Sequence, residues 1–305
     1  MEIKKVSIIG LGALGILYGN HFLNNLPKEN LRILADKNRV NKYKKNGIYC
    51  NGKKCDFNYI TPEVENDPAD LMIFSVKYGG LKSAIKSAEN QIGENTIIIS
   101  TLNGIVSEKE IGESYGIHNV VYCVAQGMDA LKKNNELTYH NIGNLCIGEF
   151  NCEKTSKKLK SVINFFEKVN LPYIIDNNMK KRLWGKFMLN VGVNQTVALY
   201  EGSFKTIQLP GKERNTMIAA MREVMEISKY EGVEITEKDL DYWLNILDTL
   251  NPKGLPSMRQ DTKAKRPSEV DLFAGTVINL GEKHNIPTPV NKMLYHEIKK
   301  IEKEF

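Results

Sequence analysis

The residues best suited to chemistry lie between Arg182 and Leu199, in the stretch RLWGKFMLNVGVNQTVAL. At 3.6 residues per turn, Lys186, Asn190 and Asn194 fall at i, i+4 and i+8 and share one stripe of a helix. Most of the other positions are apolar, which is typical of a buried helix. Because a buried ammonium and two buried amides are costly without partners, the stripe is either a satisfied polar seam between two domains or an active-site wall aimed at a small polar ligand. We favour the active-site wall.

A second pattern is a complete G-x-G-x-x-G, formed by Gly10, Leu11, Gly12, Ala13, Leu14 and Gly15. The apolar run KKVSIIG precedes it and ALGILYGNHFL follows it, which predicts a strand, a tight turn and a helix. In such a unit the glycines form the turn, leave room for a pyrophosphate and let helix and strand pack closely. The helix N-terminus offers unpaired N–H groups to the phosphates. A second predicted strand, Leu31 to Ala35, ends at Asp36, at the spacing expected for a ribose contact, so the pattern predicts dinucleotide binding.

Three further polar residues are candidates for the site. Two predicted strands, Leu71 to Val76 and Thr96 to Ser100, run into Lys77 and towards Asn103, and the carboxyl ends of parallel strands face the ligand crevice. We expect both side chains beside the cofactor, although polar residues at strand ends are also common for solubility alone. Glu269 opens the predicted helix SEVDLFAGTVINLG and is either an acidic partner for a catalytic group or a helix-start glutamate favoured by the macrodipole.

Lysine is the best candidate for a proton donor. The five histidines lie outside these motifs, which argues against a His–Asp acid pair and against a metal-dependent dehydrogenase. A partly desolvated lysine gives up its proton more readily near neutrality than a solvated one. Lys186 is therefore the predicted acid, with Glu269 as its plausible partner.

The elements that must position these residues suggest two domains. A chain of 305 residues exceeds the usual single-domain size. Strands and helices alternate up to about Asp176, and everything onward has helical periodicity. The sequence therefore predicts an α/β fold: a Rossmann-type doubly wound sheet in residues 1–176, followed by an all-helical substrate-binding and catalytic domain in residues 177–305.

Other elements follow from the same patterns. In the first segment we predict a hairpin turn at Asn51-Gly52, a helix over Leu81 to Gln91, a strand over Val120 to Val124, an antiparallel pair of strands at Leu137 to His140 and Leu145 to Gly148, a helix over Lys154 to Lys168 and a strand over Tyr173 to Ile175. In the second we predict helices over 178–200, 208–231, 236–249, 267–284 and 289–303, with a loop over 251–266. Gly185 and Gly192 share the side of the first helix away from the polar stripe, where a neighbouring helix can approach closely.

Composition narrows the class of protein. The formal net charge is +6, but basic residues are scattered among acidic ones, which favours solubility and acidic metabolites. Without a basic stripe and stacking aromatics, no nucleic-acid partner is expected. Five cysteines form no CxxC pair, so neither a metal site nor a disulfide framework is indicated. No apolar run is long enough to span a membrane, and signal-peptide cleavage would destroy the glycine motif, so we expect a cytoplasmic protein. The oligomeric state stays open, with a homodimer among the alternatives.

Taken together, GLGALG, Lys77, LNG at 102–104, WGKFMLNVGVN at 184–194, SMRQD at 257–261 and Glu269 resemble the ketopantoate reductase family. The resemblance covers essentially the whole chain, in order and with the family's spacing. It implies a Rossmann domain and a helical domain with the active site between them. It also implies roles: Lys186 is the general acid and Glu269 its acidic partner, Asn190, Asn194 and Ser257 bind the substrate, Asn103 lies near nicotinamide and substrate, and Lys77 lies on the cofactor side.

The implied reaction is the reduction of the small 2-oxo acid 2-dehydropantoate to pantoate with NAD(P)H, on the route to coenzyme A. A related reductase of another small 2-oxo acid and a non-catalytic dinucleotide sensor are the alternatives. One position departs from the family, whose members commonly carry an arginine for the 2′-phosphate of NADP at the end of the second strand. Here Asp36 stands there, followed by Lys37 and Arg39. Since a carboxylate suits a ribose hydroxyl and repels a phosphate, both NADP, the family default, and NAD are expected candidates.

Overall fold

The computed structural model describes residues 1–65, 67–150 and 155–305 and divides into two compact units. The first unit comprises Met1–Leu102 and Val106–Met179, and the second comprises Lys180–Phe305 together with Asn103–Ile105. Lys154, the predicted start of a helix, lies outside the described residues. The assignment of dinucleotide binding to residues 1–176 and of catalysis to residues 177–305 stays a prediction.

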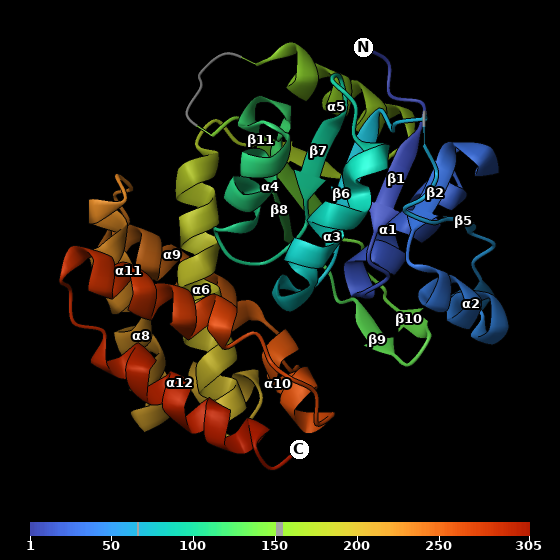
Figure 1. Ribbon diagram of the computed structural model, residues 1–305. Coiled ribbons are helices and arrows are strands. Elements are labelled where there is room, and N and C mark those ends of the chain that lie inside the picture. The colour runs from blue at the N-terminus through green and yellow to red at the C-terminus, as the bar shows by residue number, and fades with distance from the viewer. Residues whose placement is uncertain (66, 151–154) are drawn as a thin grey trace. The chain divides into compact units, whose positions relative to one another are not determined.

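The first unit is built on a five-stranded parallel sheet with the order β5-β2-β1-β6-β7 (Figure 1). Its strands are β1 (Val6–Ile9), β2 (Leu31–Leu34), β5 (Asn58–Ile60), β6 (Leu71–Phe74) and β7 (Ile97–Ser100). The chain starts in the middle of the sheet and winds outward first to one edge and then to the other. This order confirms the predicted Rossmann-type sheet.

Helices cover both faces of this sheet. Ile8 packs in a core with α1 (Ala13–Leu23) and α5 (Lys157–Lys168), whereas its neighbour Ile9 packs in a separate core with α3 (Leu81–Ala88) and α4 (Ser107–Tyr115). Successive strand residues point to opposite faces, so a strand covered on both sides reads as a continuous apolar run. A further helix, α2 (Lys37–Asn46), follows β2.

The remaining strands of this unit correct one prediction. The predicted hairpin at Asn51-Gly52 is confirmed: β3 (Tyr49–Cys50) and β4 (Lys53–Lys54) are antiparallel, and both turn residues have positive φ. The antiparallel pairing predicted for Leu137 to His140 with Leu145 to Gly148, on either side of Gly143, is wrong. Instead, β10 (Glu136–Thr138) pairs with β9 (Leu131–Lys133) and β3, and β11 (Asn144–Gly148) pairs with β8 (Tyr122–Gln126) and β12 (Tyr173–Ile175).

The reason for the correction lies at Gly143 and Asn134. A Cβ on Gly143 would lie 2.3 Å from the Gln126 carbonyl oxygen, so this glycine packs against the end of β8 and does not form a two-residue turn. The tight turn falls instead at Asn134, which has φ +55° and joins β9 to β10. Asparagine tolerates this left-handed conformation better than most residues.

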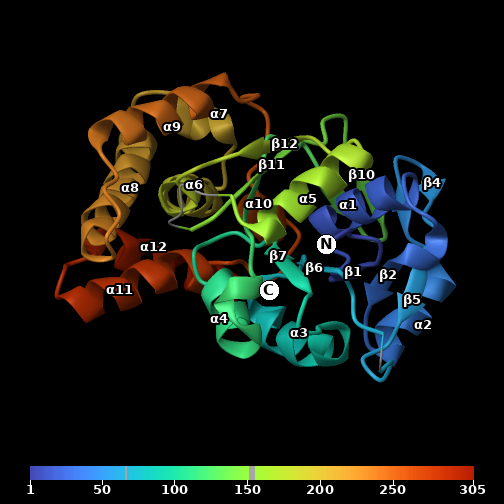
Figure 2. The same ribbon diagram turned by 90° about the horizontal axis from the view of Figure 1, so that it is seen from above.

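The second unit is helical, as predicted (Figure 2). It contains α6 (Met179–Leu199), α7 (Phe204–Gln208), α8 (Lys212–Tyr230), α9 (Glu237–Thr249), α10 (Ser257–Lys263), a π-helical turn (Asp271–Gly275), α11 (Thr276–His284) and α12 (Pro289–Glu302). The predicted loop over 251–266 is wrong where it includes α10. The helix predicted over 267–284 begins instead with the π-helical turn. Within the described residues, no helix has both the length and the apolar character that crossing a membrane requires.

Helix α6, which carries Lys186, Asn190 and Asn194 of the predicted site, has no exposed residue: every one of its residues is buried or half-buried. A Cβ on Gly185 would lie 2.5 Å from the Trp243 indole nitrogen of α9. A Cβ on Gly192 would lie 2.5 Å from Met221 of α8. The predicted close approach at these glycines is confirmed, and it involves two neighbouring helices.

Candidate active site

A line of hydrogen-bonded side chains crosses the second unit along α6. Asn194 Nδ2 donates to Asn190 Oδ1 at 3.3 Å, and Asn190 Nδ2 donates to Asn103 Oδ1 at 3.5 Å. At the other end, Ser257 Oγ donates to Asn194 Oδ1 at 3.0 Å. All four residues predicted to contact the substrate therefore lie on one continuous polar line.

Asn194 also supports the helix that carries Ser257. Its Oδ1 accepts a hydrogen bond from the Met258 backbone N–H at 3.1 Å, in the first turn of α10. The first N–H groups of a helix have no intrahelical acceptor, and Pro256 before this helix provides no side-chain cap. The side chain of Asn194, only 4% exposed, supplies the missing acceptor from α6.

Asn103 reaches this line because of the glycine that follows it. Gly104 has φ +94°, and a Cβ there would lie 2.8 Å from Leu272 Cδ1 in the π-helical turn. Only glycine fits both constraints without strain. The segment Asn103–Ile105 thus belongs to the second unit, although the chain on either side of it belongs to the first.

A buried amide network, which the sequence did not single out, links α6 to the π-helical turn. Gln195 is 0% exposed, and its Oε1 accepts a hydrogen bond from the Ala274 backbone N–H at 3.1 Å. Gly275 N–H bonds to the Val270 carbonyl five residues back, at 3.0 Å, which is the π-helical pattern. Gln195 Nε2 donates to Asn291 Oδ1 at 3.1 Å, and this second hydrogen bond fixes the orientation of the Gln195 amide inside the core. The available signal was a glutamine on a helix with no exposed face, because a buried amide needs partners.

The two predicted catalytic residues lie on α6 and just before the π-helical turn. Lys186 is half-buried on α6, one turn before Asn190. Glu269 is half-buried and precedes the π-helical turn, and its backbone carbonyl accepts the Phe273 N–H at 3.0 Å. Their roles as acid and acidic partner stay predictions.

The glycine motif in the first unit has the geometry of a phosphate cradle. Gly10 has φ +98°, and a Cβ there would lie 2.6 Å from the Ser75 carbonyl oxygen. A Cβ on Gly15 would lie 1.9 Å from the Gly10 carbonyl oxygen. Gly12 is exposed and caps α1, which has no side-chain cap and no acidic residue in its first turn. The residues present therefore fit the pyrophosphate of a dinucleotide.

The predicted ribose-contacting residues are engaged with one another. Asp36 caps α2: its Oδ1 accepts the Arg39 backbone N–H at 2.8 Å, and its Oδ2 lies 3.3 Å from Arg39 Nε. The carboxylate and the guanidinium that would favour different cofactors thus form one ion pair. Lys37 is exposed beside them, and Lys77 is exposed beyond β6, two residues after the Ser75 carbonyl that contacts the glycine turn.

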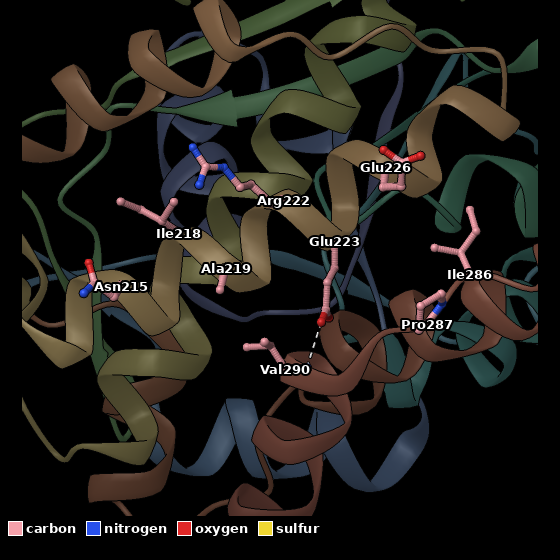
Figure 3. Close-up of a pocket in the computed structure, with 9 residues that line it drawn as sticks. All are labelled: Asn215, Ile218, Ala219, Arg222, Glu223, Glu226, Ile286, Pro287 and Val290. Atoms are coloured by element: carbon pink, nitrogen blue, oxygen red, sulfur yellow. Dashed lines mark hydrogen bonds between the residues drawn. The ribbon is translucent and has the colours of Figure 1, made fainter.

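One surface hollow of about 660 Å³ lies elsewhere in the second unit, between α8 and the segment joining α11 to α12 (Figure 3). Its lining includes Arg222, Glu223 and Val290 and none of the predicted site residues. Glu223 accepts hydrogen bonds from the backbone N–H groups of Val290 and Asn291 at 2.7 and 2.9 Å, which caps the start of α12. Helix capping explains this carboxylate, so we assign no site there.

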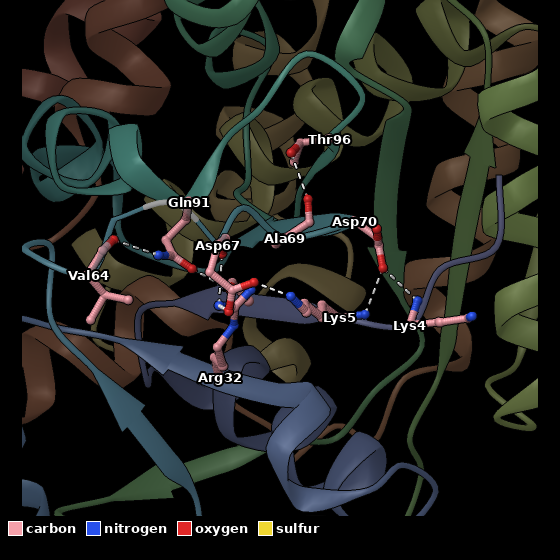
Figure 4. A network of polar contacts seen from close by, with 10 residues as sticks. Lys4, Lys5, Arg32, Val64, Asp67, Ala69, Asp70, Gln91 and Thr96 are labelled. Carbon is pink, nitrogen blue, oxygen red and sulfur yellow. Dashed lines mark hydrogen bonds and ion pairs between the residues drawn. The ribbon is translucent and has the colours of Figure 1, made fainter.

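A charged cluster at the opposite end of the sheet from the glycine motif also has a structural explanation (Figure 4). Arg32, at 4% exposure, donates to both the carboxylate and the backbone carbonyl of Asp67 at 2.9 Å. Asp67 also pairs with Lys5. The hydrogen bond from Lys5, followed by the charge of Arg32, holds the pKa of Asp67 below its usual value. Ligands of parallel sheets bind at the carboxyl edge, so this cluster stabilises the fold.

Comparison with known proteins adds the family. Residues 6–151 match the model of the ketopantoate reductase PanE/ApbA family, and residues 178–302 match that of its C-terminal domain. The chain is 26% identical over 239 residues to a 2-dehydropantoate 2-reductase of Vibrio cholerae, covering 78% of this chain and 79% of the relative. It is 24% identical to the Aquifex aeolicus protein of that name, covering 97% and 96%.

Solved structures share the fold. The ternary structure of D-mandelate dehydrogenase with NADH and anilino(oxo)acetate superimposes with a TM-score of 0.87 at 18% identity, covering 98% of this chain and 99% of the other. A dimeric ketopantoate reductase from Staphylococcus aureus gives 0.80 at 20% identity with the same coverage. With both domain models matched in order along a Rossmann-type sheet and a helical region, the chain belongs to the ketopantoate reductase family of oxidoreductases.

Proposed function

We propose that the protein reduces 2-dehydropantoate to pantoate with a nicotinamide dinucleotide. The observation that carries this proposal is the polar line from Asn103 through Asn190 and Asn194 to Ser257. Its two central residues lie on α6, the helix that also bears Lys186. The substrate offers a carboxylate, a ketone and a hydroxyl on a small skeleton. Amides, a serine hydroxyl and an ammonium are groups that bind these functions. The names of the curated relatives support the same substrate.

The proposed roles follow from the chemistry of each side chain. The bound cofactor supplies hydride to the ketone carbon. Lys186 Nζ donates a proton to the alkoxide oxygen that develops there, a contribution of typically ~10²–10⁴-fold. Asn190, Asn194 and Ser257 hold the substrate's carboxylate and hydroxyl, and Asn194 also fixes Ser257 against α6. Glu269 acts as the acidic partner in the site, while Asn103 lies near the nicotinamide and Lys77 on the cofactor side.

We propose that both NADH and NADPH serve as cofactor. The glycine cradle binds the pyrophosphate that they share, and the Asp36–Arg39 pair offers one group to the ribose 2′-hydroxyl and one to the 2′-phosphate. We further propose a homodimer as the assembly, in line with the dimeric relative, and light scattering of the purified chain tests it.

A related reductase with another 2-oxo acid is the competing function, supported by the structural likeness to D-mandelate dehydrogenase. A substrate with a phenyl group in place of the hydroxyl would offer no polar group to this part of the line, and a polar site that loses a ligand hydrogen bond binds more weakly. The polar line therefore favours the hydroxylated substrate.

A turnover assay separates the alternatives. Purified protein is given NADH or NADPH with 2-dehydropantoate, with its analogue lacking the hydroxyl, or with phenylglyoxylate, and cofactor oxidation is followed by absorbance. We expect kcat/KM for 2-dehydropantoate to exceed the other two by about tenfold or more. A preference for phenylglyoxylate would support the related reductase. Cofactor binding with no turnover of any substrate would support a dinucleotide sensor.

A further inference from the structure

The inference concerns Lys132, a residue of β9 that reaches the glycine motif from a distant part of the sequence. Lys132 Nζ donates a hydrogen bond to the Leu11 backbone carbonyl at 2.8 Å. Lys132 is half-buried, whereas its neighbours Leu131 and Lys133 are exposed. The strand therefore turns this one lysine inward, onto the second residue of the phosphate cradle.

The position of this hairpin relative to the cradle is fixed by the core of the first unit. Leu137 of β10 is 0% exposed and pairs with Cys50 of β3, which is 3% exposed. Both belong to the same hydrophobic core as Ile16 and Leu17 of α1. Because β9 pairs with β10, Lys132 is held near the start of α1 by buried apolar contacts as well as by its own hydrogen bond.

The electrostatics of this placement point to an anion. Leu11 immediately precedes Gly12, the N-cap of α1, and a helix N-terminus carries a partial positive charge. Cations are favourable near helix C-termini and unfavourable near N-termini. An ammonium held at this end is therefore poorly matched to the helix itself, and well matched to a phosphate shared between the ammonium and the helix N–H groups.

We propose that Lys132 is a cofactor-binding residue that pairs with the pyrophosphate of the dinucleotide. This inference rests on the proposed cofactor, since it assigns one more residue to the same cradle. The backbone N–H groups of the glycine motif supply hydrogen bonds, and Lys132 supplies a full charge that they lack. A lysine that only tied the hairpin to the cradle would need a donor at this position and no charge.

Three variants separate the charge from the tether. Lys132→Gln keeps an N–H donor and removes the charge, Lys132→Arg keeps both, and Lys133→Gln makes the same change of net charge at the exposed neighbour. Dissociation constants are measured by fluorescence for NADH and by calorimetry for ADP-ribose, which retains the pyrophosphate and lacks the nicotinamide. Each titration is repeated at low and at high salt, and melting temperatures are recorded.

We expect Lys132→Gln to weaken both ligands by about tenfold at low salt and to reduce the salt dependence of binding. Lys132→Arg and Lys133→Gln should stay within about twofold of the unaltered protein. Unchanged binding in Lys132→Gln would overturn the inference and leave Lys132 as a tether. Equal losses in Lys132→Gln and Lys132→Arg, with lowered melting temperatures, would also overturn it. If the unaltered protein bound neither NADH, NADPH nor ADP-ribose, the proposed function itself would fall, and the inference with it.

Discussion

The hydrogen bond from Ser257 Oγ to Asn194 Oδ1, 3.0 Å long, makes a residue of α6 position the first residue of α10. The same oxygen accepts the Met258 N–H, so the carboxamide of Asn194 is oriented by two donors from one helix end. Its nitrogen then points along α6 to Asn190. Asn194 therefore has two separable functions: its oxygen holds α10, and its nitrogen continues the polar line.

Substitution of Asn194 by aspartate or alanine should separate these functions. Asn194→Asp keeps an acceptor, and a carboxylate is favourable at the start of α10, so stability should be retained. Asn194→Ala leaves the Met258 N–H and Ser257 without their acceptor and should lower the free energy of unfolding by roughly 1–3 kcal/mol. Both should lower kcat/KM for 2-dehydropantoate by about tenfold or more, since a carboxylate also repels the substrate's own.

Urea unfolding and steady-state kinetics on the same preparations test this pair. An aspartate variant with normal kcat/KM would show that the nitrogen of Asn194 contributes nothing to substrate binding. Equal destabilisation of both variants would contradict the assigned role of the oxygen.

Removal of the proposed acid should affect the chemical step and spare the cofactor. Lys186→Ala should lower kcat by ~10²-fold or more, because a positioned general acid typically contributes this much. The dissociation constant of NADH should change little, since in our proposal the glycine cradle holds the phosphates. Lys212→Ala, at an exposed lysine in the first turn of α8, is the control and should match the unaltered protein. Near-normal kcat in Lys186→Ala would remove lysine from the mechanism.

The sequence predicted those parts of the fold that depend on short-range periodicity. Four strands of the parallel sheet, β1, β2, β6 and β7, are mostly apolar runs, and the polar stripe of α6 repeats every four residues, so both were visible without a structure. The Asn51-Gly52 turn was equally clear because both residues tolerate positive φ.

Features set by distant contacts were not predictable in this way. In the π-helical turn the Ala274 N–H donates to the side chain of Gln195, which lies 79 positions earlier in the sequence. The Met258 N–H of helix α10 donates to Asn194, because Pro256, the residue before this helix, has no side chain that could accept it. Lys132 was missed because nothing local marks a lysine in a short strand as one that faces a glycine motif. In each case the decisive partner lies on another element.

We expect the Arg32–Asp67 ion pair to make a pH-dependent contribution to the free energy of unfolding. Asp67→Asn removes the carboxylate partner of a buried guanidinium and should lower the free energy of unfolding by about 1–2 kcal/mol. This is less than for a fully buried pair, because the Asp67 side chain is 46% exposed and its charge is screened by water. Asp56→Asn, which removes the partner of the exposed Lys28, is the matched control and should cost less than about 0.5 kcal/mol.

The pH profile gives an independent check on Asp67. Its pKa is lowered from 3.8 in the folded protein, chiefly by the hydrogen bond from Lys5. The stabilisation is therefore complete above the unfolded pKa and is lost as the pH falls through the lowered folded pKa. The difference in unfolding free energy between the unaltered protein and Asp67→Asn should be constant between about pH 7 and pH 5 and shrink below about pH 4. A constant difference at all pH values would mean that the carboxylate's charge is irrelevant.

Cofactor preference should be adjustable through the Asp36–Arg39 pair without loss of helix α2. Asp36→Asn removes the negative charge and keeps a good N-cap, which an arginine at this position would not. In this variant the ratio of kcat/KM for NADPH to kcat/KM for NADH should rise by about tenfold, because a like charge no longer faces the 2′-phosphate. Arg39→Gln should shift the ratio towards NADH, and Lys44→Gln, an exposed lysine in the last turn of α2, should leave it unchanged. In the unaltered protein we expect kcat/KM for the two cofactors to differ by less than about tenfold, with at most a slight preference for NADH. The opposite charges of Asp36 and Arg39 act on the 2′-position from similar distances and largely cancel. A hundredfold preference for NADPH before any substitution would show that Lys37 and Arg39 dominate and that Asp36 serves only as the cap of α2.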